Sequence, residues 1–379
     1  MRITAVRITP LFLPLRQPYH WAYGTVHGAE PVLVEIDTDA GVTGVGESVG
    51  ATDAATVAAA LARVTPDLIG HDAFDIARLV ERLHRKHFGG IGPANQRRYS
   101  NQILTGVELA LWDAVGKALG QPVHRLLGGA VRDEIAYFGF VQGDGPEEVG
   151  AHARELAEQG FAVIYLKVGR GDELDVANAR AVRAAIGEQR RLWMDANEAW
   201  DTLTARRMID KLLPFAPEFI EQPSAAESPS ALARLRQAVS VPIAADQLVS
   251  TPQQVFEVCR HAAADVIVLG IHETGGIGGM RKAAAVAEAA GLNICLHGCY
   301  ESGITTCASN QVAATLPNLD DGNQIMVQLL AEDVVAAPLL ATMDGRLPVL
   351  EGPGLGFELD RDAVAGAAER YRIQAAAVG

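Results

Sequence analysis

Short apolar runs recur through the middle of the chain, and each run leads into a polar, charged or small residue. The runs are AVIYLKVG, RLWMDANEAW, EFIEQP, VPIAAD, DVIVLG and NICLH, and the strand ends they predict are Lys167, Asp195, Glu221, Asp246, Gly270 and His297. These positions follow one another at intervals of 28, 26, 25, 24 and 27 residues. A parallel strand, a helix and two short loops need about that length. The pattern therefore predicts buried parallel strands that alternate with helices.

The segments between these runs have apolar residues at helical spacing and are predicted helices. They are Glu147–Gln159, Glu173–Ile186, Thr202–Leu213, Ser230–Val239, Pro252–Cys259, Met280–Ala290 and Ile304–Leu316. Seven or eight strand–helix units between about Val131 and Leu319 indicate a closed eight-stranded barrel. An open doubly wound sheet is the alternative, but its ligand residues would gather at one switch point.

The first 125 residues show a different pattern and are expected to form a separate domain. Val32–Glu47 predicts a β-hairpin, and helices are predicted at Ala54–Leu68, Ala73–His87 and Gln102–Leu119. Phe88–Asn101 is rich in glycine and polar residues and is predicted to be a loop. After Asp320 the alternation stops, and the C-terminal segment is expected to return to the first domain. The predicted division is 1–125, 126–320 and 321–379.

Composition narrows the class of protein. The 379 residues are 49% hydrophobic and 21% charged, an ordinary balance for a soluble protein, and the formal net charge is -14. This charge argues against a nucleic acid or an anionic membrane as partner. No apolar stretch is long enough to span a membrane, so a cytoplasmic enzyme is expected. Three of the four cysteines lie near His297, so a zinc site is a candidate, but Cys295 lies inside an apolar run and the cysteines are expected to be mainly buried small hydrophobic residues.

Several predicted strand ends carry groups suited to chemistry. Side chains at the C-terminal ends of consecutive parallel strands converge on one mouth of a barrel. Lys167, Asp195, Glu221, Asp246 and His297 are therefore expected to face one pocket. Three carboxylates, a lysine and a histidine at successive strand ends are hard to explain as solvated loop residues.

Longer motifs point to a known family. LTGVELALWDAVGKALGQPVHRLLGG, WMDANEAW, IEQP, PIAAD and the glycine pairs of ETGGIGG resemble the mandelate racemase / muconate lactonizing enzyme group of the enolase superfamily. The resemblance covers almost the whole chain, in the same order and spacing. It implies a modified (β/α)8 barrel of the TIM type. An α+β capping domain, formed by the N-terminal region and the C-terminal segment, would cover the barrel.

The resemblance also implies roles for the strand-end residues. Asp195, Glu221 and Asp246 match the family's three Mg2+ ligands, so one Mg2+ per subunit is expected. Carboxylate oxygens suit such a hard cation. Lys167 matches the second lysine of the family's Lys-x-Lys motif, the base that takes a proton. A neighbouring divalent cation should disfavour the ammonium form and lower the pKa of Lys167.

Tyr165 and His297 depart from the family pattern in different ways. Tyr165 replaces the first lysine of the motif and could hydrogen-bond Lys167, hydrogen-bond the substrate or simply pack. The sixth-strand position, where relatives carry a lysine or the aspartate partner of a histidine, is Gly270 here. His297 is therefore expected to be a catalytic acid or a substrate contact without its aspartate. Glu273 lies just beyond Gly270 and could be a loop residue.

Candidate substrate contacts come from the expected capping loops and from the barrel mouth. Arg97 and Arg98 could hold an anionic or hydroxylated group of the substrate. The alternative is that the capping residues lie in solvated loops without contact to a substrate. The candidates are His20, Trp21, Tyr23, Arg97, Tyr99, Asn197 and Glu301.

The expected first step is metal-assisted removal of the α-proton of a small carboxylate substrate. Lys167 as base and His297 or Tyr165 as acid favour a dehydratase of a hydroxy acid or acid sugar. Racemisation or epimerisation is the second possibility, and cycloisomerisation is the third because the sixth-strand lysine is lacking. A barrel that binds metal and carboxylate without catalysis is a further alternative. A homo-oligomer is expected from the resemblance alone.

Overall fold

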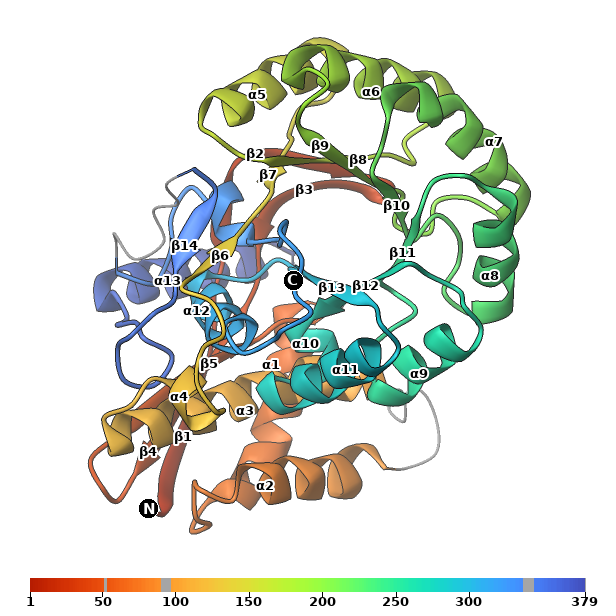
Figure 1. The fold of residues 1–379 in the computed structure, drawn as a ribbon. Helices are drawn as coiled ribbons and strands as arrows, with labels where there is room; N and C mark the ends of the chain where they lie inside the picture. Colours follow the sequence, from red (N-terminus) through yellow and green to blue (C-terminus); the bar gives the residue numbers. More distant parts are fainter. Residues whose placement is uncertain (51–52, 90–96, 337–343, 379) are drawn as a thin grey trace.

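The computed structural model describes residues 1–50, 53–89, 97–336 and 344–378 of the chain. At its centre seven strands form one parallel sheet in the order β13-β12-β11-β10-β9-β8-β7, which curves into a barrel (Figure 1). The strands are β7 Gly139–Phe140, β8 Val163–Lys167, β9 Arg191–Asp195, β10 Phe219–Glu221, β11 Ile243–Ala245, β12 Val266–Gly270 and β13 Asn293–His297. The predicted strand ends are confirmed at Lys167, Asp195, Glu221, Gly270 and His297, and Asp246 directly follows β11.

Helices between successive strands cover the outside of the barrel, as Figure 1 shows for α5 to α9 and α11. This arrangement buries both faces of each strand, which explains the nearly continuous apolar runs. The helices are α5 Pro146–Glu158, α6 Asp172–Ile186, α7 Thr202–Leu212, α8 Pro229–Ala238, α9 Pro252–Arg260, α11 Ile277–Ala289 and α12 Gly303–Ala313. All seven helices predicted from the spacing in this region are confirmed, with ends that differ by a few residues.

The barrel closes through an irregular segment after α12 rather than through a regular eighth strand. On one side Asp320 N donates to Ile294 O at 2.8 Å, and Gln324 N donates to Leu296 O at 2.9 Å. On the other side Phe138 N donates to Asn323 O at 3.0 Å. Residues 319–324 therefore join β13 to the start of the sheet, which favours a closed barrel over an open sheet.

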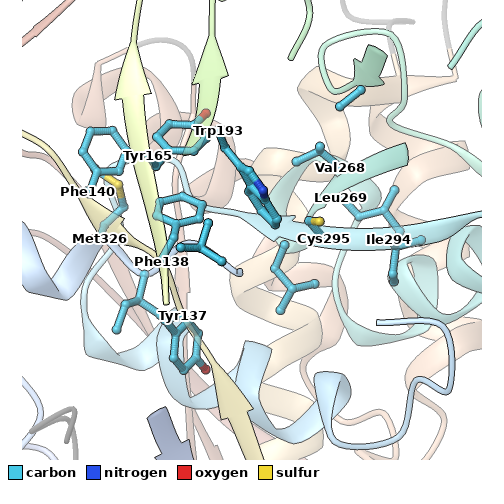
Figure 2. Close-up of a cluster of buried hydrophobic side chains, with 14 of the residues drawn as sticks. Tyr137, Phe138, Phe140, Tyr165, Trp193, Val268, Leu269, Ile294, Cys295 and Met326 are labelled. Atoms are coloured by element: carbon cyan, nitrogen blue, oxygen red, sulfur yellow. The ribbon is translucent and has the colours of Figure 1, made fainter. Parts of the chain in front are cut away.

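Large side chains fill the barrel interior (Figure 2). The rings of Phe138 and Tyr165 are stacked, with centroids 4.2 Å apart and an interplanar angle of 4°. Trp193 and Phe219 pack beside them with centroids 4.4 Å apart. Cys295 and Cys307 are fully buried, as expected for small hydrophobic residues, whereas Cys259 and Cys299 are partly buried. The interior is a packed core, so only the mouth can hold a ligand.

The N-terminal region forms a separate α+β unit around an antiparallel sheet of β1 Ile3–Pro10, β4 Val32–Thr38 and β5 Thr43–Ser48. The predicted hairpin is therefore confirmed. A second hairpin, β2 Leu13–Trp21 with β3 Gly24–Ala29, extends toward the barrel (Figure 1). The helices are α1 Ala54–Val64, α2 Ile76–Leu83 and α3 Arg97–Leu119.

The predicted loop between α2 and α3 is partly wrong. Helix α3 begins at Arg97, so Arg97–Asn101 are helical, while residues 90–96 lie outside the described part. The helical start is stabilised because Asn101 and Thr105 bind the barrel: Asn101 Nδ2 donates to Glu273 O at 2.7 Å, and Thr105 Oγ1 donates to His272 O at 3.2 Å. Sequence patterns cannot report such distant contacts.

Helix α3 lies unusually close to the sheet of the N-terminal unit. A Cβ atom at Gly46 would come within 3 Å of Gly106 O, and one at Gly106 would come within 3 Å of Ser48 Oγ. Glycine at both positions therefore permits the contact of α3 with β5. Since α3 also binds the barrel, it connects the two parts of the molecule.

The C-terminal segment contacts the N-terminal unit at its last helix. Arg361 Nη1 lies 2.6 Å from Glu35 Oε1, and Phe12 N donates to Ala367 O at 3.1 Å. The remaining elements are η1 Thr65–Leu68, η2 His84–Phe88, α4 Val123–Leu126, β6 Glu134–Ala136, η4 Leu213–Phe215, α10 Ile271–Thr274, η5 Met326–Leu329, β14 Arg346–Pro348 and α13 Arg361–Val378. Among the described residues, no helix has both the length and the apolar character needed to cross a membrane.

Candidate active site

A cavity of about 670 Å³ lies at the mouth of the barrel, beneath the β2–β3 hairpin. The strand-end residues that the sequence predicts to converge all line it: Lys167, Asp195, Glu221, Asp246 and His297. Three of the predicted substrate contacts, Trp21, Tyr23 and Asn197, line it as well. The convergence follows from the parallel register, which places Lys167 beside Asp195, Asp195 beside Glu221 and Gly270 beside His297.

The other predicted substrate contacts do not line this cavity. His20 lies on β2, and its Nδ1 is 3.0 Å from Thr25 Oγ1 on β3. Glu301 is buried and accepts a hydrogen bond from Cys299 N. In these positions both side chains serve local structure.

Arg97 and Tyr99 lie at the start of α3 on faces away from the cavity. Arg97 is exposed and forms an ion pair with Glu81 at 3.3 Å. Tyr99 packs against the core of the N-terminal unit. The neighbouring Arg98 is the residue that points to the site: it lines the cavity, and its Nη1 donates to Gln247 O at 3.2 Å.

The three carboxylates are almost completely buried, with exposed fractions of 0% for Asp195, 3% for Glu221 and 3% for Asp246. Burial, reinforced by repulsion from Asp195 and Asp246, raises the pKa of Glu221 well above its ordinary value. Burial also raises the pKa of Asp246. Asn197 N donates to the carboxylate oxygen Asp195 Oδ1 at 2.7 Å, and the main chain of Asp246 is held because its N–H donates to Gln222 Oε1 at 3.0 Å. A cluster of this kind needs positive charge nearby.

Lys167 supplies part of that charge. Its Nζ contacts Asp195 Oδ2, and the side chain is 9% exposed. Burial lowers the pKa of Lys167, but the charges of Asp195 and Glu221 outweigh burial and raise it. From the sequence, a lowered pKa is expected for Lys167 because a divalent cation would lie beside it. The protein groups alone have the opposite effect and raise the pKa of Lys167.

Tyr165 shows two of the alternatives considered for it, since it contacts Lys167 and packs in the core. Its hydroxyl donates to Asp195 Oδ2 at 2.6 Å and lies 3.2 Å from Glu221 Oε2. Lys167 Nζ donates to the same hydroxyl at 3.4 Å. The ring meanwhile packs on Phe138. Tyr165 therefore ties the barrel core to the carboxylates.

The chemistry of these side chains fits Mg2+, a hard cation with oxygen ligands. Among the described residues, Asp246 Oδ1 is buried without a hydrogen-bond partner, and repulsion from Asp195 and Asp246 helps to raise the pKa of Glu221. A bound cation would relieve this repulsion. In their present positions, the described residues include no group of three His, Cys, Asp or Glu side chains arranged to hold a metal ion. Lys167 and Tyr165 contact the carboxylates instead.

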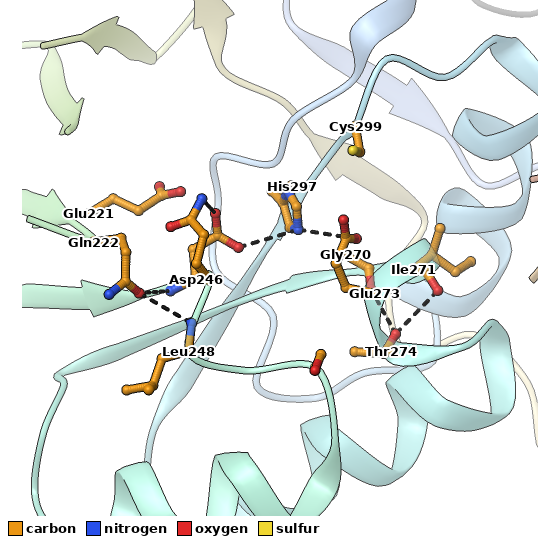
Figure 3. Close-up of polar contacts among 12 residues, drawn as sticks. Glu221, Gln222, Asp246, Leu248, Gly270, Ile271, Glu273, Thr274, His297 and Cys299 are labelled. Carbon is orange, nitrogen blue, oxygen red and sulfur yellow. Dashed lines mark hydrogen bonds and ion pairs between the residues drawn. The ribbon is translucent and has the colours of Figure 1, made fainter. Parts of the chain in front are cut away.

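His297 has a carboxylate partner that the sequence did not reveal. Its Nε2 lies 3.3 Å from Asp246 Oδ1 and 3.4 Å from Glu273 Oε2, both ion-pair contacts (Figure 3). Burial lowers the pKa of His297, but the charges of Asp246 and Glu273 outweigh burial and raise it to about 10. The sixth-strand position holds Gly270 and no aspartate, but Glu273 lies close enough to His297 to act as its acidic partner. Glu273 is no loop residue but lies on the one-turn helix α10 with 2% exposure.

Aromatic rings form part of the cavity wall, and sequence reasoning identified only some of them. Trp21 and Tyr23 come from the β2–β3 hairpin, with ring centroids 5.0 Å apart. Tyr19 on β2 and Tyr300 after β13 complete it, with centroids 6.0 Å apart. Alternation along β2 places Tyr19 on the same face as Trp21, and this signal could have identified Tyr19.

Two family models match the chain. The model described as "Mandelate racemase / muconate lactonizing enzyme, N-terminal domain" matches residues 3–128. The model described as "Enolase C-terminal domain-like" matches residues 148–363. Together they cover the N-terminal unit, the barrel and much of the C-terminal segment.

Known proteins resemble the chain over nearly its full length. Muconate cycloisomerase 1 of Rhodococcus opacus is 34% identical, with 96% of this chain and 98% of that protein covered. L-Ala-D/L-Glu epimerase of Bacillus subtilis is 30% identical, with coverage of 94% and 97%. Among solved structures, a dipeptide epimerase from Cytophaga hutchinsonii, complexed with Mg and the dipeptide D-Ala-L-Val, superposes with a TM-score of 0.89. It is 26% identical, with coverage of 97% and 98%.

Proposed function

The chain belongs to the mandelate racemase / muconate lactonizing enzyme family of the enolase superfamily, and from this membership we propose that it is a Mg2+-dependent racemase or epimerase. Its substrate would be a small carboxylate with a proton on the α-carbon. One face of that carbon would lose the proton, and the other face would receive one.

The observation that carries the proposal is the placement of Lys167 and His297 in one cavity. Lys167 ends β8 and His297 ends β13, and four strands of the sheet separate them. Three of these four strands carry the carboxylates: Asp195 ends β9, Glu221 ends β10 and Asp246 directly follows β11. A substrate held at the carboxylates would thus have a proton-transferring group on each side, as 1,1-proton transfer requires.

Asp195, Glu221 and Asp246 would hold the metal. When bound there, Mg2+ would supply positive charge that offsets the charge gained by the substrate carboxylate as the α-proton leaves. Lys167 Nζ, as a neutral amine, would take the proton on its side, and the imidazolium form of His297 would deliver one from the other side, which leaves a lysine ammonium and a neutral imidazole. The aromatic wall would exclude water from the substrate.

The dehydration expected from the sequence has less support. That preference rested on an unpaired His297, whereas Glu273 now lies 3.4 Å from its Nε2. The relatives named above are a cycloisomerase and epimerases, so they favour an isomerase. Cycloisomerisation is the second candidate because muconate cycloisomerase 1 is 34% identical. Against it, Gly270 stands where that subgroup carries its sixth-strand lysine.

A pooled carboxylate library incubated with the Mg2+-loaded protein in D2O tests the proposal. The library should contain N-acylated amino acids, dipeptides, acid sugars and cis,cis-muconate. Deuterium gain at the α-carbon, with inversion seen by chiral chromatography, supports a racemase or epimerase. Formation of a lactone from muconate supports a cycloisomerase, and loss of water supports a dehydratase; either outcome contradicts the proposal.

Lys167→Ala provides the matched control for this assay. We expect exchange to fall by about 100- to 10,000-fold, the range that general-base catalysis by a positioned side chain contributes. Mg2+ binding, measured by calorimetry, should persist because the three carboxylates remain. An inert wild-type protein that still binds Mg2+ and carboxylates would instead support a non-catalytic binding barrel.

A further inference from the structure

We propose that Glu273 is the positioning residue of His297, in a pairing that the absence of a side chain at Gly270 makes possible. The inference rests on the proposed function for the role of His297, but its geometry can be tested without turnover. In relatives an aspartate at the end of the sixth strand is the partner of the histidine. Here that role would belong to Glu273, three residues after the strand-end residue Gly270.

The first argument is the space around Gly270. The parallel register places Gly270 directly beside His297. A Cβ atom at Gly270 would come within 3 Å of both Glu273 Oε2 and His297 Nε2. Any side chain at this strand end would therefore occupy the space through which Glu273 and His297 approach each other (Figure 3).

The backbone does not explain the glycine. Gly270 has φ -92° and ψ 135°, an extended conformation that any residue adopts. Neither a turn nor a positive φ requires glycine at this position. The spatial requirement of the Glu273–His297 pair is the remaining explanation for it.

The second argument is that both oxygens of Glu273 are fixed. Oε2 faces His297, whereas Oε1 accepts a hydrogen bond from Gln102 Nε2 at 3.1 Å and lies 3.7 Å from Arg98 Nη2. Gln102 and Arg98 both lie on α3, the helix that connects the N-terminal unit to the barrel. The carboxylate is thus clamped in one orientation, which is what positioning of an acid–base group requires.

The third argument concerns the other partner of His297. Asp246 Oδ1 also lies 3.3 Å from His297 Nε2, but Asp246 is a proposed Mg2+ ligand. Glu273 lies one strand further along the sheet and does not belong to the ligand set. It is therefore the carboxylate that metal binding leaves for the imidazole of His297.

The test moves the carboxylate from one site to the other. Glu273→Gln keeps the size and the contact with α3 but removes the charge. Gly270→Asp combined with Glu273→Ala places a carboxylate at the strand end. Removing the Glu273 side chain relieves one of the two close contacts of a Cβ at this position, and the ring of His297 must shift to relieve the other. Gly270→Ala keeps Glu273 but blocks its approach to His297, which gives a second route should Glu273→Gln fold poorly.

Nuclear magnetic resonance of the full chain, labelled with 15N at histidine and loaded with Mg2+, gives a readout independent of substrate. The ring signals of His297 are identified by their loss in His297→Gln. In Glu273→Gln and Gly270→Ala we expect these signals to shift more than those of any other histidine. In the double variant they should return toward the wild-type position. Unchanged His297 signals in Glu273→Gln would overturn the proposal.

With a chiral substrate from the D2O screen, the two faces can be followed separately. Glu273→Gln should slow exchange of the enantiomer served by His297 by roughly 100-fold, with little change in KM. Exchange of the enantiomer served by Lys167 should persist, which is an internal control for folding and metal binding. Equal loss for both enantiomers would mean that Glu273 is merely structural. A wild-type protein without exchange would refute the proposed function, while the resonance experiment would still decide the pairing.

Discussion

Tyr165 on β8 shows how one side chain can contribute both to the packed core and to the proposed metal site. The ring belongs to the packed interior of the barrel, and the hydroxyl reaches two proposed metal ligands. A lysine at this position would have added a positive charge beside Lys167. Tyrosine supplies a hydrogen-bond donor without that charge, so the carboxylates keep more of their attraction for a cation.

Tyr165→Phe separates these two roles. The ring should still stack on Phe138, so thermal stability should change little. Asp195 loses a buried donor that lies 2.6 Å away, and we expect Mg2+ affinity to fall by about 10-fold, the lower end for groups that orient metal ligands. Calorimetric titration with Mg2+ measures the affinity. An unchanged affinity would mean that Tyr165 only packs.

Helix α3 contacts the barrel helix α11 through the carboxylate of Glu108, which binds the first turn of α11. Glu108 accepts hydrogen bonds from Ile277 N at 3.0 Å and Gly278 N at 2.9 Å, at the N-terminus of α11. Trp112 Nε1 donates to it at 2.9 Å. The N–H groups of a helix start have no partners within the helix, so Glu108 satisfies two of them from another part of the fold.

Burial raises the pKa of Glu108 to about 7, although these three donors lower it. The folded state then holds its proton more tightly than the unfolded state, whose pKa is near 4.5. Stability from this group is present below pH 4.5 and lost as pH rises to 7. The loss amounts to about 3 kcal/mol over that interval.

Glu108→Gln should remove this pH dependence. Between pH 5 and 7.5, urea unfolding should show the wild-type protein losing stability relative to the variant. The exposed Glu155→Gln is the control and should leave the pH profile unchanged in shape. Parallel profiles for the wild-type protein and Glu108→Gln would contradict the raised pKa.

The elements also show what sequence could and could not predict. Strand ends such as Lys167 and Asp195 were predictable because the period of the barrel fixes their place, and parallel register then brings them together. Glu273 was not, because a one-turn helix has no detectable period and its orientation depends on Gln102, 171 residues away. Arg97 was misplaced for a similar reason, since contacts with the barrel extend α3 into an apparent loop.

The cavity forms between segments that are far apart in the chain, from the β2–β3 hairpin to the residues after β13. The base of the β2–β3 hairpin is fixed to the C-terminal segment: Ala331 N donates to Pro14 O at 2.8 Å, and Arg16 Nε donates to Leu330 O at 2.7 Å. The tip of the same hairpin carries Trp21 and Tyr23 to the barrel mouth. In the proposed function the barrel would supply the reacting groups, and the hairpin of the N-terminal unit would supply part of the surface that meets the rest of the substrate.

That surface is aromatic, and the substrate should match it. The rings of Trp21 and Tyr300 lie 6.3 Å apart across the cavity wall. With Mg2+ present, 3-phenylpropanoate should bind more tightly than D-gluconate, because apolar contact with the rings releases water. Trp21→Ala should weaken 3-phenylpropanoate binding by roughly 10- to 100-fold, since about 100 Å² of lost apolar contact costs about 2.5 kcal/mol.

Calorimetry with both ligands distinguishes this specificity from simple loss of the site. Gluconate binding should change little in Trp21→Ala, and Trp21→Phe should retain most of the affinity for 3-phenylpropanoate. Tighter binding of gluconate by the wild-type protein would contradict the prediction and would return acid sugars to the first place among candidate substrates. An equal loss of affinity for both ligands in Trp21→Ala would show that the hairpin tip stabilises the cavity instead of selecting the substrate.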